Sequence, residues 1–272
     1  QVIFDLSFEI PDGKFVVLIG PSGCGKTTTL KMINRLIQPN AGHIYIDGED
    51  IAKQDKVTLR RRIGYVIQPI GLFPNMTVAQ NICVVPKLLK YSKEQCDQIV
   101  RDMLAMVEMP YEQYANKYPS EMSGGQQQRI GILRALAASP PVVLMDEPFS
   151  ALDPMTRRSL QIEVKNLQQK LNKTIVFVTH DMDEAIKLAD RICIIQDGKV
   201  AQCDTPENIL KHPANQYVTE FIGANRLWAN PEYIRAADIM RRRPFTISKG
   251  RTVIQALQIM RHNSVESLLV LD

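Results

Sequence analysis

The 272-residue sequence contains no apolar run that approaches the roughly 20 residues needed to cross a bilayer. Its first residues, QVIFDLSFEI, also lack the basic, apolar and small-residue segments of a secretory signal. Nothing in the sequence therefore indicates a membrane-inserting segment. We expect any association with a membrane to depend on a partner.

Cysteine is sparse and shows no paired spacing. The five cysteines are scattered, odd in number and never spaced as C-x-x-C. This distribution argues against a disulfide framework, so we expect reduced cytosolic thiols. The positions are Cys24, Cys83, Cys96, Cys193 and Cys203.

A strong excess of one charge is also missing. The net charge of +4 rests partly on two clusters, Arg60–Arg62 and Arg241–Arg243, and such clusters are usually solvated surface. We expect no nucleic-acid partner. A hydrophobic content of 45% and a charged content of 23% are ordinary for a globular protein. The length of 272 residues is sufficient for more than one domain.

Short apolar runs rich in β-branched residues recur along the chain, with helical patterns between several of them. This alternation predicts an α/β fold with a largely parallel sheet covered on both faces. Such sheets bind ligands beyond the carboxyl ends of their strands. The runs are Phe15–Ile19, Ile63–Ile67, Val142–Met145, Thr174–Thr179 and Arg191–Ile195.

Two regions depart from the alternation. Strand signals vanish between Gln68 and Ser123, where Lys93–Met109 is typical of an amphipathic helix. We therefore predict a helical insertion over about residues 69–130, within a first domain of residues 1–225. The apolar face of that helix is predicted to hold Ile99, Met103, Met106 and Val107.

After a linker, residues 226–235, a second unit is predicted over residues 236–272. FTIS is strand-like, TVIQALQIMRHN is helical and ESLLVLD returns to strand. This βαβ-like pattern begins near Arg235 and is unfinished at Asp272. The helical face is predicted to hold Val253, Ala256, Leu257 and Met260.

The stretch GPSGCGKTT follows the first strand and opens a helix, and it fits the pattern G-x-x-x-x-G-K-[ST]. In such a phosphate loop, or P-loop, glycines let backbone N–H groups face phosphates, while Lys26 reaches the β and γ groups and the Thr27 hydroxyl ligates Mg²⁺. A chance glycine-rich turn is less consistent with the flanking strand and helix. The predicted loop comprises Gly20, Pro21, Ser22, Gly23, Cys24, Gly25, Lys26, Thr27 and Thr28.

Two consecutive carboxylates, Asp146 and Glu147, end the buried run VVLM. By itself such a pair is usually a solvated turn. In a protein with a phosphate loop, Asp146 is suited to bind Mg²⁺, and Glu147 could orient or deprotonate a water.

Three further polar residues fall at strand ends or in their loops. Gln68 could contact the Mg²⁺ shell or the attacking water, and His180 follows a strand, although a lone His is more often a packed core residue. Asp153 with Pro154 fits a helix N-cap and a first-turn proline.

The stretch EMSGGQQQR places two adjacent glycines at a helix start. Ser123 and Gln126 fit a capping box. Gly124 and Gly125 remove side chains from a helix N-terminus whose N–H groups and dipole favour an anion. We therefore predict that this helix end contacts a phosphate.

Taken in order, GPSGCGKTT, Gln68, MSGGQQQR, VVLMDEP, SALD and TH resemble the ATP-binding cassette (ABC) ATPases over roughly residues 1–225. The resemblance implies ATP and Mg²⁺, with Thr27, Gln68 and Asp146 on the metal. It also implies a head-to-tail homodimer, in which the SGGQ helix of one copy contacts the γ-phosphate held by the other. It does not fit a kinase or a GTPase.

The same resemblance implies roles for the remaining residues. Glu147 would be the general base, and His180 would sense the γ-phosphate. Asp153 would link the two sites, and Gln68 would report the nucleotide state to a membrane subunit.

A narrower resemblance comes from IGYVIQPIGLFPNMTVAQNI, THDMDEAIKLADRI and DTPENILKHPANQYVTEFIG. These segments are similar to the ATPase subunits of bacterial importers for osmoprotectants such as glycine betaine, carnitine and choline. This implies permease subunits, an external solute-binding protein or domain that selects the solute, and a place at the cytoplasmic face of the membrane. Residues 236–272 are similar to the start of a cystathionine-β-synthase-type (CBS) module, which implies a nucleotide-type regulator.

Three features depart from the family pattern. Pro69 stands where many relatives have a second Gln, and Met122 replaces the usual Leu before SGGQ, a change of similar volume. The adenine-stacking aromatic normally lies upstream of Gln1, so we assign none and expect the natural N-terminus to lie further upstream.

Other functions remain open. Non-transport ATPases of the superfamily usually carry two cassettes or a long coiled-coil insertion, and neither pattern occurs in this sequence. A nucleotide sensor without turnover would need neither Glu147 nor His180. Import of a different solute is also compatible with the sequence.

Overall fold

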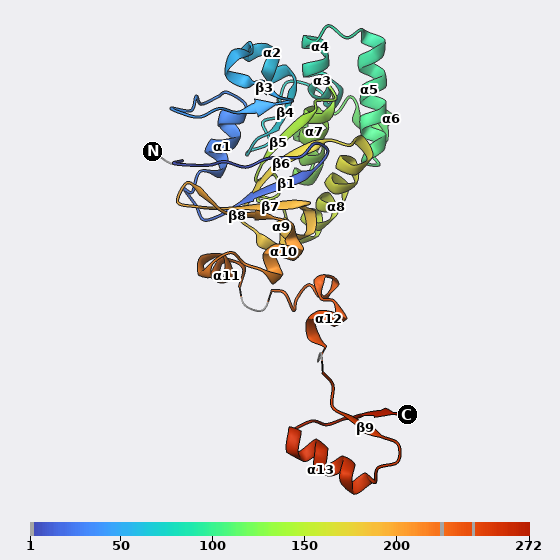
Figure 1. The fold of residues 1–272 in the computed structure, drawn as a ribbon. Coiled ribbons are helices and arrows are strands. Elements are labelled where there is room, and N and C mark those ends of the chain that lie inside the picture. Colours follow the sequence, from blue (N-terminus) through green and yellow to red (C-terminus); the bar gives the residue numbers. More distant parts are fainter. Residues whose placement is uncertain (1–2, 224–225, 241–242) are drawn as a thin grey trace. The chain divides into compact units, whose positions relative to one another are not determined.

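The computed structural model describes residues 3–223, 226–240 and 243–272 (Figure 1). The chain divides into two compact units, Gln1–Gly223 and Ala224–Asp272. Residue 225, the predicted end of the first domain, lies outside the described residues, as do Arg241 and Arg242 of the second arginine cluster.

A six-stranded sheet forms the centre of the first unit, in the order β4-β5-β6-β1-β7-β8. The first five of these strands pair in parallel, as predicted, and β8 pairs antiparallel with β7. The edge strand β8 was not predicted. The bounds are β4 Ile63–Val66, β5 Val142–Asp146, β6 Thr174–Thr179, β1 Phe15–Ile19, β7 Arg191–Gln196 and β8 Lys199–Asp204.

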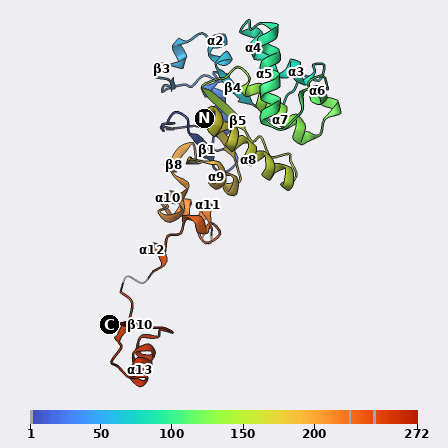
Figure 2. The ribbon, with the colours of Figure 1, turned by 90° about the vertical axis from the view of Figure 1, so that its right-hand side faces the viewer.

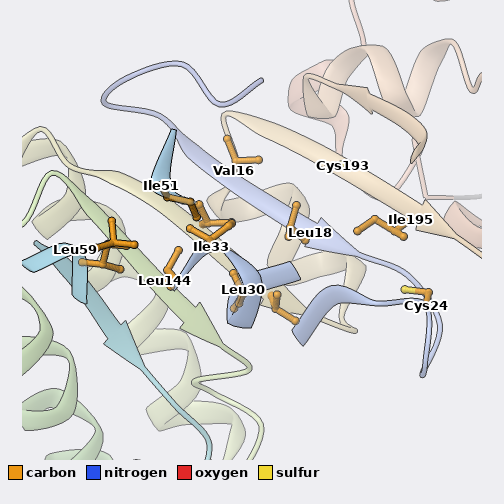
Figure 3. Packing of buried hydrophobic residues seen from close by; sticks show 13 residues of the cluster. Val16, Leu18, Cys24, Leu30, Ile33, Ile51, Leu59, Leu144, Cys193 and Ile195 are labelled. Atoms are coloured by element: carbon orange, nitrogen blue, oxygen red, sulfur yellow. The ribbon is translucent and has the colours of Figure 1, made fainter. Parts of the chain in front are cut away.

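Alternate side chains of the strands supply two apolar layers, because successive residues of a strand point to opposite faces. On one face, the sheet packs against α1 (Lys26–Ile33) and α2 (Lys56–Arg61) (Figure 3). The buried residues of this layer include Val16, Leu18, Leu30, Ile33, Leu59, Leu144, Val176, Val178, Cys193 and Ile195.

The opposite face carries a group of three phenylalanine rings. The ring centroids of Phe15 and Phe177 lie 5.6 Å apart, and those of Phe149 and Phe177 lie 5.5 Å apart. Lys165 of α8 (Pro154–Leu171) lies over the Phe15 ring, at 5.3 Å from its centroid. Helix α9 (Met182–Leu188) contacts β1 and β6. The predicted covering of both faces is therefore confirmed.

One member of the first arginine cluster has a structural role that the sequence did not indicate. Arg60 donates to the backbone carbonyls of Asn34 and Arg35, at 3.2 and 2.7 Å, where α1 ends. The neighbouring segment contains β2 Tyr45–Ile46, β3 Glu49–Asp50 and the 3-10 turn Ile51–Lys53.

A group of helices follows β4 and lies at one end of the first unit (Figures 1 and 2). Its members are α3 Val78–Ile82, α4 Val84–Leu88, α5 Lys93–Met106, α6 Tyr111–Tyr114, a 3-10 turn Pro119–Glu121 and α7 Gly124–Leu136. The expectation that strands are replaced by helices in this stretch is confirmed.

The buried face of α5 differs from the predicted one. Met103 and Val107 are buried as expected, but Ile99 and Met106 are only half-buried. The stripe instead runs through Cys96, Val100, Met103 and Leu104. Cys96 behaves as a small apolar residue at a helical spacing from Val100, and this extends the stripe along that side.

The first unit ends with α10 Pro206–Lys211 and α11 Gln216–Ile222. The second unit contains a 3-10 turn Pro231–Tyr233, α12 Ala236–Ile239, β9 Thr246–Ser248, α13 Val253–Asn263 and β10 Leu269–Leu271. Strands β9 and β10 pair in parallel, so the predicted strand-helix-strand pattern is confirmed.

The sequence-based expectations also concerned the state of the cysteines and the presence of membrane-spanning segments. The five cysteines are all free thiols. No helix in the described parts of the chain is both long and apolar enough to span a membrane.

A buried carboxyl group ties α8, β6 and α9 together. Glu184 of α9 accepts hydrogen bonds from the Thr179 hydroxyl at 2.6 Å and from the Gln161 amide at 3.1 Å. Burial raises the pKa of Glu184. The Thr179 hydroxyl also accepts a hydrogen bond from the Asp181 N–H at 3.0 Å, so this network contacts the residues on both sides of His180.

We predict that Glu184→Ala lowers the free energy of unfolding by about 2 kcal/mol, because it leaves two buried donors without an acceptor. Glu184→Gln should cost less, since its amide oxygen still accepts one bond. Urea unfolding followed by circular dichroism measures both. Equal stability of the native and Glu184→Ala chains would contradict this assignment.

Candidate nucleotide site

Four neighbouring parallel strands deliver several of the predicted site residues to one edge of the sheet. Gly20 follows β1, Gln68 follows β4, Asp146 ends β5 and His180 follows β6. Since β4, β5, β6 and β1 are consecutive in the sheet, their carboxyl ends share this edge.

The predicted phosphate loop is a turn that leads into α1. The α1 N-cap is Gly25, with φ +107°, and Gly23 has φ +81°, so both adopt left-handed conformations that glycine tolerates best. At Gly20, a Cβ would lie 2.2 Å from the Ile195 carbonyl oxygen, so this glycine lets the loop pass close to β7. Pro21, Ser22 and Gly23 are exposed, Thr27 and Thr28 are half-buried, and Cys24, Gly25 and Lys26 are buried.

The ammonium group of Lys26 lies within the loop. Its Nζ donates to the backbone carbonyls of Gly20 and Pro21, at 2.7 and 2.9 Å, and the residue is only 7% exposed. A cation held at this point beside loop N–H groups favours an anionic ligand.

Thr27 of α1 and Asp146 of β5 face each other. The Thr27 hydroxyl donates to Asp146 Oδ1 at 2.9 Å. Burial is the main cause that raises the pKa of Asp146, and the neighbouring Glu147 charge adds to it.

This pair supplies oxygen donors of the kind that Mg²⁺ prefers. Among the described residues, no group of three or more His, Cys, Asp or Glu side chains is arranged to hold a metal ion. Mg²⁺ is commonly bound through one or two protein ligands, with substrate phosphates and waters completing its shell. The donor set therefore fits a metal that is held jointly with a phosphorylated ligand.

Glu147, His180 and Gln68 belong to one hydrogen-bonded chain. His180 Nδ1 lies 3.1 Å from Glu147 Oε2. On the other side, the Gln68 amide donates to Ser150 Oγ at 2.6 Å, and Ser150 Oγ donates to the Glu147 carbonyl at 3.1 Å. Ser150 was not among the predicted site residues, although it opens the SALD motif.

The backbone also fixes the direction of Glu147. Its φ is +44°, an unusual value for a residue with a side chain, and its N–H donates to the Val178 carbonyl at 3.0 Å. This turn lets Asp146 face Thr27 while Glu147 faces His180. The two consecutive carboxylates therefore have different partners.

The predicted capping box at the SGGQ helix is confirmed. Gln126 N donates to Ser123 Oγ at 3.3 Å, and Ser123 N donates to Gln126 Oε1 at 3.0 Å. The Gln126 amide also donates to the Tyr114 hydroxyl at 3.3 Å.

The two glycines of this helix have different surroundings. A Cβ at Gly124 would meet nothing within 4 Å, so this position is open. A Cβ at Gly125 would lie 2.5 Å from Thr156 Cγ2, so this glycine makes room for α8. The packing role of Gly125 was not predicted, because it depends on a helix from elsewhere in the chain.

Asp153 is the predicted N-cap of α8, and the structure confirms it. Its Oδ1 accepts from the N–H groups of Met155 and Thr156, both at 3.1 Å, with Pro154 at the first helical position. Hydrogen bonding to Thr156 lowers the pKa of Asp153. Because Gly125 lies against Thr156, the starts of α7 and α8 are adjacent.

The start of the SGGQ helix and the phosphate loop share no hydrogen bond in the described parts of the chain. None of the hydrogen bonds in the described parts of the chain joins Ser123, Gly124, Gly125 or Gln126 to residues 20–28. The two groups predicted to contact phosphate are therefore not joined by hydrogen bonds within the described parts of one chain.

Comparison with known proteins gives two family matches. Residues 3–150 match the family described as "ABC transporter", and residues 236–272 match the CBS domain.

Several curated relatives match this chain over its whole length. The chain is 59% identical to the glycine betaine/carnitine/choline transport ATP-binding protein OpuCA of Bacillus subtilis (strain 168), covering 72% of that protein. It is 58% identical to the choline transport ATP-binding protein OpuBA of the same organism, again covering 72%. It is 55% identical to the carnitine transport ATP-binding protein OpuCA of Listeria monocytogenes, covering 68%.

Among solved structures, the chain is similar to the dimeric ATP-binding cassette MJ0796 in a post-hydrolysis state bound to ADP and Pi. The TM-score is 0.66 at 37% identity, over 75% of this chain and 90% of that one. The fold, the order of the motifs and the relatives agree, and the chain belongs to the ABC transporter family of ATPases.

Proposed function

We propose that this chain is the ATP-hydrolysing subunit of a bacterial importer for quaternary-amine osmoprotectants such as glycine betaine, carnitine and choline. The main observation in support of hydrolysis is the position of the Glu147 carboxylate. Its Oε2 lies 3.1 Å from His180 Nδ1, and Glu147 directly follows Asp146, which is paired with Thr27. The solute class comes from the relatives that match the whole chain, which are named as transport proteins for glycine betaine, carnitine and choline. These names also favour transport over a non-transport ATPase.

The phosphates of ATP would be bound by loop N–H groups of residues 20–28 and by Lys26. The Lys26 ammonium is already in place, held by two carbonyls that a phosphate could displace. Thr27, Asp146 and Gln68 would hold Mg²⁺, which when bound neutralises charge on the phosphate oxygens.

Hydrolysis would use Glu147 as the general base. The carboxylate accepts a proton from water, the water oxygen attacks the γ-phosphorus, and the bond to ADP breaks. His180 would restrain the Glu147 carboxylate through their contact, and we propose that it senses the γ-phosphate. Much of the rate gain in such a site comes from positioning.

A complete site would need two copies of the chain. In the proposed head-to-tail dimer, Ser123, Gly124, Gly125 and Gln126 of one copy contact the γ-phosphate bound by the loop of the other. The open surroundings of Gly124 support this arrangement, as does the lack of hydrogen bonds between this helix end and the phosphate loop among the described residues. Asp153 lies at the helix start adjacent to that surface, where it could link the two sites.

We further propose that the dimer binds integral-membrane permease subunits at the cytoplasmic face of the bacterial membrane. An external solute-binding protein or domain would then select the solute. The unit that matches the CBS domain would bind a nucleotide-type regulator.

Glu147→Gln tests the general base. The substitution keeps the shape of the side chain but removes its basicity, so hydrolysis should fall by about 10²–10⁴-fold while ATP still binds. Steady-state phosphate release and gel filtration with ATP measure turnover and the ATP-bound dimer. Glu112→Gln, on the exposed surface of α6, is the matched control and should behave as the native chain does. Normal turnover in Glu147→Gln would show that another group is the base.

Lys26→Ala tests both ATP binding and import. Loss of the ammonium group should abolish ATP binding in equilibrium dialysis. It should also abolish uptake of labelled glycine betaine at high osmolarity, in cells that lack other uptake systems and express the complete transporter. Lys93→Ala, at the start of α5, is the control. Hydrolysis without betaine uptake in the native transporter would remove the solute assignment and leave the ATPase.

A further inference from the structure

Helix α7 holds the loop that connects β4 to α3. Arg134 Nη1 donates to the Gly71 carbonyl at 2.7 Å, and Arg134 Nη2 donates to the Ile70 carbonyl at 3.0 Å. The Arg134 side chain is half-buried, and this burial lowers its pKa. The forked guanidinium binds two consecutive carbonyls at once, which a lysine ammonium cannot match geometrically.

A second contact joins the same loop to the same face of α7. Gly131 lies three residues before Arg134, and residues at this spacing share a helix face. A Cβ at Gly131 would lie 2.6 Å from Ile70 Cγ2. The absence of a side chain therefore lets Ile70 approach the helix, while Arg134 holds the carbonyl of the same residue.

Asn81 anchors the far half of the loop, where the Arg134 guanidinium also lies over the Phe73 ring, 5.9 Å from its centroid. Asn81 of α3 is fully buried, donates to the carbonyls of Phe73 and Met76, and accepts from Phe73 N–H at 2.8 Å. At the near end, Gln68 reaches Ser150. Arg134 therefore holds the stretch between Gln68 and the Asn81 anchor.

We infer that Arg134 is a positioning residue for hydrolysis. By fixing Ile70 and Gly71 to α7, it sets where Gln68 meets Ser150 and, through Ser150, the turn that carries Glu147. The helix that begins at Ser123 and the loop that begins at Gln68 are thereby held together. This inference rests on the proposed roles of Gln68 and Glu147.

The chain offers a matched control on the same helix. Arg129 also makes two hydrogen bonds, at 2.8 and 2.7 Å, but to the Glu163 carboxylate of α8. Replacing Arg129 or Arg134 by Met removes a comparable guanidinium from α7. Only the Arg134 substitution releases the loop that follows Gln68.

A double-mutant cycle on the full chain tests the inference. Arg134→Met should lower kcat about tenfold and change KM for ATP by less than about twofold. In a Gln68→Ala background, the same substitution should lower kcat by less than about twofold, because residues that act through one another are not additive. Arg129→Met should have the same fold effect in both backgrounds. Arg134→Lys should recover part of the lost kcat, and it replaces Arg134→Met in the cycle if that variant does not fold.

An Arg134 effect of equal size in both backgrounds would overturn the inference, because Arg134 would then act only on stability or elsewhere. Unchanged kcat in Gln68→Ala would overturn it together with the role of Gln68, while leaving Glu147 as the base. Absence of hydrolysis in the native chain would instead contradict the proposed function itself.

Discussion

Parallel pairing of four buried strands is the constraint on which the rest of the structure depends. Parallel strands end at the same edge, and the order β4-β5-β6-β1 brings four distant parts of the sequence to that edge. The apolar layers on both faces fix this register, because a shift by one residue would turn every core side chain toward the wrong face. The site is thus a consequence of the core.

Close contacts between helices give the other half of the arrangement. Gly125 lets the first turn of α8 approach α7, and the Arg129–Glu163 pair joins the same two helices further along. The Ser123 and Asp153 helix starts are therefore set side by side by packing. In the proposed dimer, this shared surface is the one that meets the phosphate loop of the other copy.

Much of the fold and site could be predicted because the signals are local. The phosphate loop, the parallel strands and the caps at Ser123 and Asp153 each depend on residues within a few positions of one another. The edge strand β8 lacks a strong apolar run, and only its pairing with β7 reveals it. On α5, the face depended on Cys96, whose apolar character the sequence leaves ambiguous.

Contacts between distant residues could not be predicted from local patterns. Gln68 and Ser150 are 82 positions apart, and Arg134 and Ile70 are 64 apart. Nothing near Ser150 or Arg134 in the sequence marks these partners. Likewise, local sequence does not explain why residue 125 must be a glycine. Only the fold shows that Thr156 of α8 occupies the place where a side chain at Gly125 would lie.

The measurement that tests the central claim most directly is ATP hydrolysis by a mixture of two inactive full-length variants. Lys26→Ala keeps an intact SGGQ helix, and Ser123→Arg keeps an intact phosphate loop. If each site combines the loop of one copy with the helix of the other, mixed dimers contain one complete site, and the mixture should hydrolyse ATP when neither variant does alone. If the mixture forms dimers but remains as inactive as its components, the proposal of a site shared between two copies is contradicted.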